Sequence, residues 1–163
     1  MTSNATSAVN FPFPERKRIR AWVIREYLDN AGRRQVVCFS SGNAAQQLRV
    51  AGLDVVEVGP CGVLQSERWW TPAQIARVWP DRFDATSGHL PLTLMLDLAR
   101  EYQQRLQTQV GPSAIHYIPT GSGETILCLR WAFPLTRFLP LYNVGPGTEW
   151  NAKAPLNGLV GLT

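Results

Sequence analysis

Two glycine-rich turns, each between a strand-like run and a helix-like run, constrain the fold of this chain most. The first is Ser40-Ser41-Gly42-Asn43, after the apolar run 36–39, and the second is Thr120-Gly121-Ser122-Gly123-Glu124-Thr125, after the run 115–119. A turn of this kind directs several backbone N–H groups and the positive end of a helix dipole at one spot, which favours an anion. The two turns therefore predict a bound phosphorylated or carboxylated molecule.

The alternation of strand and helix patterns predicts an α/β fold. The patterns run in the order helix 15–31, strand 35–39, helix 44–51, strand 53–58, helix 71–79, helix 92–107, strand 114–118, a helix ended by Pro134, and strand 139–144. Strand–helix–strand units pair their strands in parallel, so we expect a three-layer sandwich with a mainly parallel sheet. Ligands of such sheets bind at the carboxyl ends of the strands, where both turns would lie.

The length of the chain, 163 residues, allows one domain with a single core. Residues 1–14 are expected to form a flexible lead, residues 15–144 the α/β domain, and residues 145–163 a tail rich in Gly and Pro. Neither a membrane span nor a secretion leader is visible, which predicts a cytoplasmic protein that does not contact a membrane. A domain of this size is also expected to bury surface against a copy of itself.

The net charge of +4 comes from fourteen Arg and two Lys, against twelve acidic residues. Arginine recognises phosphate and carboxylate groups through its planar fork. The densest basic run, residues 15–20, lacks the signature of any nucleic-acid-binding module, so nucleic acid is not an expected partner. The three cysteines have no CxxC spacing and predict neither a disulfide framework nor a metal site.

The order of these motifs resembles the fold-type II pyridoxal-phosphate enzymes, the superfamily of the tryptophan synthase β-subunit, threonine synthase and cysteine synthase. The resemblance runs from about Pro14 to Val144 and depends on the two turns and on an early lysine. It implies a reduced tryptophan synthase β-like architecture with pyridoxal 5'-phosphate as cofactor. The implied function, in amino acid metabolism, is that of a lyase or β-replacement enzyme acting on a small amino acid.

The same resemblance implies a site built from both turns. The implied roles are contact with the cofactor ring for Asn43, substrate carboxylate binding for Ser40, Ser41 and Gly42, and cofactor phosphate binding for Gly121, Ser122, Gly123 and Thr125. Independently of the resemblance, His89 lies in a polar turn before a helix and is expected to line the cleft as a substrate-binding residue.

Lys17 takes the position of the catalytic lysine, which in the family holds the cofactor as a Schiff base and shuttles the α-proton. The flanking Arg16, Arg18 and Arg20 are expected to favour its neutral, nucleophilic form by like-charge repulsion. Glu124 stands where the phosphate-binding turn of the family usually has glycine. A carboxylate there would repel a phosphate unless its side chain turned outward, where it could still favour the helix N-terminus.

Two other functions stay open at this point. The chain is short for the family, which favours a non-catalytic descendant of the fold acting as an assembly or interaction subunit. A nucleotide- or sugar-phosphate-binding enzyme would use the same two turns.

Overall fold

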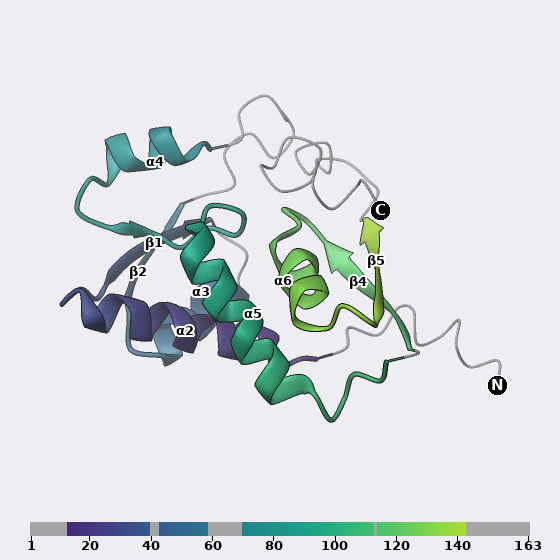
Figure 1. Ribbon diagram of the computed structural model, residues 1–163. Helices are drawn as coiled ribbons and strands as arrows, with labels where there is room; N and C mark the ends of the chain where they lie inside the picture. Colours follow the sequence, from purple (N-terminus) through teal and green to yellow (C-terminus); the bar gives the residue numbers. More distant parts are fainter. Residues whose placement is uncertain (1–12, 40–42, 59–69, 113, 143–163) are drawn as a thin grey trace.

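The computed structural model describes residues 13–39, 43–58, 70–112 and 114–142 (Figure 1). The elements, in chain order, are α2 Arg16–Asn30, β1 Gln35–Phe39, α3 Asn43–Val50, β2 Asp54–Val58, α4 Pro72–Val78, β3 Phe83–Asp84, α5 Leu92–Leu106, β4 Ile115–Thr120, α6 Glu124–Ala132 and β5 Arg137–Tyr142. The α/β class is confirmed, with helices between short parallel strands. The predicted lead 1–14, apart from its last two residues, and the whole predicted tail 145–163 lie outside the described residues.

The first sheet has the strand order β2-β1-β3, with β1 in the centre. Its middle residues Val36, Val37 and Cys38 are all buried, as expected for a parallel strand that is covered on both faces. The predicted unit of strand, helix and strand is confirmed, because β1 and β2 pair in parallel from Gln35↔Asp54 to Phe39↔Val58. Strand β3 was not predicted; its two residues lie in a segment whose sequence indicates only irregular structure.

The second sheet consists of β4 and β5, paired in parallel from Ile115↔Arg137 to Thr120↔Tyr142, with α6 between them in the chain. Among the described residues the five strands therefore form two separate parallel sheets. Figure 1 shows them on opposite sides of α5. Both sheets contain a strand–helix–strand unit of the kind that the two glycine-rich turns predict.

Helix α5 connects the two halves of the core because it packs against both α2 and α6. The predicted helix is confirmed, but its apolar stripe only in part, since Leu92 and Leu96 are exposed and the buried face is formed by Leu94, Met95, Leu98, Ala99, Tyr102 and Leu106. The main core extends from α2 and β1 through α5 to α6 and β5. A smaller cluster, formed by Val37, Val58 and Ile75, lies between the first sheet and α4.

Helix α4 begins with the capping box that the sequence predicts. The Thr71 hydroxyl accepts a hydrogen bond from the Gln74 backbone N–H at 3.1 Å, and the Gln74 side chain accepts one from the Thr71 N–H at 2.8 Å. We expect Thr71→Ala to lower the free energy of unfolding by about 1 kcal/mol, because it leaves a helix N–H without its acceptor. Urea unfolding followed by tryptophan fluorescence measures the change.

The matched control is Thr93→Ala, at an exposed position in the first turn of α5 where no capping bond is formed. Alanine has the higher helix propensity, so this variant should be as stable as the parent or slightly more so. Equal stability of the two variants would show that the capping box contributes nothing measurable.

No helix in the described ranges is both long and apolar enough to cross a membrane.

Candidate functional site

A cavity of about 210 Å³ lies where α2, the end of β1, the end of β4 and the start of α6 meet. We call it the Lys17 cavity. Its lining residues are Arg16, Lys17, Cys38, Phe39, Ala44, Ala85, Thr86, Ser87, Pro119, Thr120, Gly121, Ser122, Gly123, Glu124, Thr125 and Ile126. The carboxyl ends of β1 and β4 thus reach the same space although they belong to different sheets, as the position of the two turns predicts.

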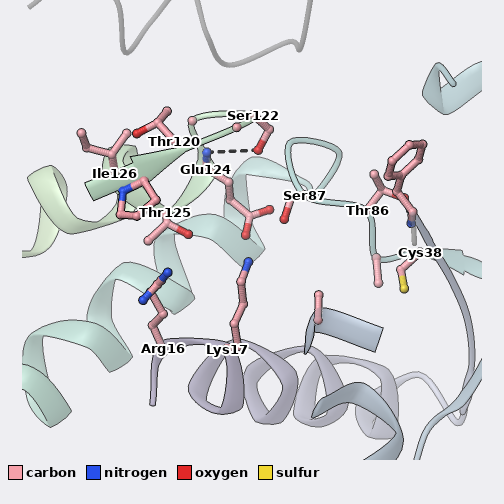
Figure 2. Close-up of a pocket in the computed structure, with 16 residues that line it drawn as sticks. Arg16, Lys17, Cys38, Thr86, Ser87, Thr120, Ser122, Glu124, Thr125 and Ile126 are labelled. Atoms are coloured by element: carbon pink, nitrogen blue, oxygen red, sulfur yellow. Dashed lines mark hydrogen bonds between the residues drawn. The ribbon is translucent and has the colours of Figure 1, made fainter. Parts of the chain in front are cut away.

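Lys17 lies in the first turns of α2 and is half-buried. Its side chain extends from the helix into the cavity, toward Glu124 (Figure 2). No ion pair within the described part of the chain includes the amine. Burial lowers the pKa of Lys17 to about 8, with further lowering by the charges of Arg20 and Arg16, and Glu124 acts in the opposite direction. An appreciable fraction of the amine is therefore neutral, and so nucleophilic, close to neutral pH.

The predicted like-charge repulsion on Lys17 comes from Arg20 and Arg16. Arg18 is exposed, does not line the cavity and is not among the charges that shift the pKa of Lys17 most. Burial, which the sequence did not predict, has a larger effect on the Lys17 pKa than any neighbouring charge.

All four residues predicted to bind phosphate line the cavity: Gly121, Ser122, Gly123 and Thr125. Gly123 is the N-cap of α6 and has φ of +94°, a conformation that glycine adopts without steric cost. The Ser122 hydroxyl accepts a weak hydrogen bond, 3.3 Å long, from the Glu124 backbone N–H. The helix α6 directs the positive end of its dipole at this turn, which favours a bound anion.

The side chain of Glu124 does not turn outward but inward, and it is only 1% exposed. Its carboxylate forms an ion pair with Arg20, with Nε to Oε2 at 2.5 Å and Nη2 to Oε1 at 3.1 Å. The carboxylate accepts a third hydrogen bond, from the backbone N–H of Gly88 to Oε1 at 3.1 Å. Burial opposes ionisation, but the charge of Arg20 and its hydrogen bonds outweigh it, so the pKa of Glu124 lies below its usual value.

Two predicted site residues do not line the cavity. Asn43 is exposed at the start of α3 and is not among the described residues that line the cavity, although Ala44 beside it is. His89 has a fully buried side chain, and its Nδ1 lies 2.6 Å from a carboxylate oxygen of Asp84. The structure therefore does not bring His89 to the predicted cleft. Ser40, Ser41 and Gly42 lie outside the described residues.

The loop before α5 supplies cavity residues that were not predicted from the sequence. Thr86 accepts a hydrogen bond from the Phe39 N–H at 3.1 Å through its hydroxyl, and its own N–H donates to Asp84 Oδ1 at 3.0 Å. These bonds attach the loop to the end of β1 and place Ser87 at the cavity (Figure 2). The run of polar residues at 84–89 was the available signal, because polar turns between strand and helix commonly border ligand sites.

No protein family, no curated protein and no solved structure matches this chain. The described residues also contain no group of three or more His, Cys, Asp or Glu side chains placed to hold a metal ion. The function must therefore be argued from the cavity itself.

Proposed function

We propose that this chain binds pyridoxal 5'-phosphate in the Lys17 cavity, with Lys17 holding the cofactor through its amine and the turn Gly121–Thr125 receiving the phosphate. The observation that carries the proposal is that Lys17 and this turn, far apart in the sequence, line one cavity. An amine that binds an aldehyde and a helix N-terminus that binds a phosphate are the two groups that such a cofactor needs.

The residues present fit the cofactor in charge as well as in kind. Glu124 would repel a phosphate if it were unpaired, but its charge is balanced by Arg20. Lys17, when protonated, then adds a positive charge to the lining. The volume of about 210 Å³ is below the range of roughly 300–1,000 Å³ typical of drug-sized ligands, which restricts the site to small molecules.

The proposed reaction class is a lyase or β-replacement reaction on a small amino acid. When bound, the cofactor ring supplies an electron sink for charge that develops at the α-carbon. The chain itself supplies Lys17, whose Nζ is able to take up and return a proton because its pKa is about 8. Thr86 and Ser87 line the cavity beside it and are available to orient the substrate.

The proposal also includes a three-layer arrangement of the fold, self-association of the chain and its location in the cell. A three-layer arrangement is supported by α4 packing on the first sheet through Ile75, on the face away from α2. Self-association is supported by Ile115, Tyr117 and Leu141, which are exposed on the second sheet, because parallel sheets are ordinarily covered on both faces. We also propose a cytoplasmic location.

A second candidate function is that of a non-catalytic interaction subunit with the same scaffold. The exposed position of Asn43 favours it, since the implied contact with the cofactor ring is then missing. Under this alternative the purified chain does not bind added pyridoxal phosphate.

The test is to mix the purified full chain with pyridoxal phosphate, record the visible absorption spectrum, reduce with borohydride and identify the modified peptide by mass spectrometry. We expect a visible band and a modification at Lys17, formed faster as the pH rises toward about 8 because the neutral amine is the attacking form.

Lys153 is the other lysine in the sequence and provides the control. Lys17→Arg, which keeps the positive charge, should abolish the band, and Lys153→Arg should keep it. Modification at Lys153 alone, or no band at all, would overturn the proposal. A nucleotide or sugar phosphate retained through purification would instead indicate the third function considered from the sequence.

A further inference from the structure

The ion pair of Arg20 and Glu124 joins the described walls of the Lys17 cavity. Lys17 and Arg20 are three residues apart and so lie on the same face of α2. Glu124 is the first residue of α6, and Gly88 belongs to the loop before α5. Arg20 also donates from Nη2 to the carbonyl oxygen of Ala85, in the same loop, at 2.8 Å. The carboxylate of Glu124 is therefore fixed from two directions.

This fixed carboxylate faces the reactive amine. In Figure 2 the Lys17 Nζ and the Glu124 carboxylate point toward one another across the cavity. Arg20 is 2% exposed and Glu124 is 1% exposed. Charges that are shielded from water interact more strongly than charges at a surface, so both members of the pair act on the nearby amine.

We propose that the Arg20–Glu124 pair positions Lys17 for reaction: the fixed carboxylate draws the amine into the cavity, and the adjacent guanidinium keeps the amine from becoming a permanent ion-pair partner of that carboxylate. The proposal deepens the proposed function and rests on it, since it concerns Lys17 as the reactive amine. Glu124 and Arg20 are positioning residues and are not assigned any contact with the ligand.

The charge balance around Lys17 supports this role. The charged or titratable groups that act on the amine are Arg16 and Arg20 on α2, Glu124 on α6 and the Cys38 thiol on β1. Arg20 and Glu124 have the largest effects of these, and they act in opposite directions. With the carboxylate alone the amine would stay charged, and with the guanidinium alone it would be repelled from the cavity.

The test is a direct titration of Lys17 in the full chain without cofactor. Reductive methylation with isotope-labelled formaldehyde gives each of the two lysines an NMR signal that shifts with pH, and Lys153 serves as the internal reference. We expect Glu124→Gln to lower the Lys17 pKa by about one unit and Arg20→Met to raise it by about one unit. The double variant should return close to the parent value.

A merely structural role of the pair does not produce shifts of opposite sign. Glu101→Gln is the matched control, because Glu101 is also ion-paired, to Arg105, but does not act on Lys17. Circular dichroism establishes that each variant is folded during the titration. If a single variant does not fold, Glu124→Asp withdraws the carboxylate from the amine and is expected to lower the Lys17 pKa by about half a unit.

Shifts of the same sign in the two single variants, or no shift in folded variants, would overturn the proposal. Because the titration contains no pyridoxal phosphate, its result is separate from the cofactor test. Opposite shifts together with a failure to bind the cofactor would keep the positioning role and reject the proposed function. Cofactor binding at Lys17 without these shifts would keep the proposed function and reject the positioning role.

Discussion

Glu124→Ala is expected to lower the free energy of unfolding by roughly 3–5 kcal/mol, because it leaves the charge of Arg20 buried without a partner. The loss also frees the Gly88 N–H and removes a connection between α2 and α6. Urea unfolding, followed by circular dichroism and by tryptophan fluorescence, measures the change. Agreement of the two probes is needed for a two-state analysis.

The control for this prediction is Glu101→Ala on α5. Glu101 is ion-paired with Arg105, but that arginine is largely exposed, so the loss should be below about 1 kcal/mol. The double variant Arg20→Met with Glu124→Leu replaces both charges by apolar groups and should recover most of the stability. A Glu124→Ala variant as stable as the Glu101→Ala variant would contradict the buried pairing.

Phe138→Ala is expected to cost about 3–5 kcal/mol, the range for removing a buried aromatic ring. Phe138 lies on β5, is 2% exposed and stacks on the His116 ring of β4 with a centroid distance of 5.7 Å. It also contacts Phe133 after α6, at 6.3 Å between centroids. Thermal and urea unfolding measure the loss, and hydrogen exchange of the β4 amides locates it.

Leu135→Ala is the control for Phe138→Ala, because Leu135 lies in the same region and is 80% exposed. Its effect should stay within about 0.5 kcal/mol. If Phe138→Ala left the stability unchanged, the second sheet would not belong to the common core.

The fold could be predicted from the sequence wherever a local pattern was long enough. Helix α5 followed from its apolar spacing, and α4 followed from Thr71, Pro72 and Gln74. Strand β3 could not be predicted, because two residues are too short for a pattern and their pairing with β1 is a tertiary contact. The division into two sheets was also missed, since strand patterns do not specify which strands become neighbours.

The candidate site was also predictable only in part, because a local sequence pattern indicates a motif but not its tertiary contacts. Lys17 and the Gly121–Thr125 turn are recognisable from short motifs, and the structure places both at one cavity. The pairing of Arg20 with Glu124 joins positions 104 residues apart, so no local pattern indicates it. Arg20 lies one helical turn from Lys17, however, and a basic residue there was a signal that an acidic partner should be sought.

The placement of the Lys17 cavity between two separate sheets has a consequence for how its shape is maintained. One wall is formed at β1 and α2, and the other at β4 and α6. Besides the Arg20–Glu124 pair, helix α5 holds these walls together by packing against α2 and α6, so we expect the width of the cavity to depend on that packing. We therefore expect substitutions that change the volume of a buried α5 side chain, for example Leu98, to alter the affinity and selectivity of the cavity from a distance. The groups that a bound molecule touches would stay the same.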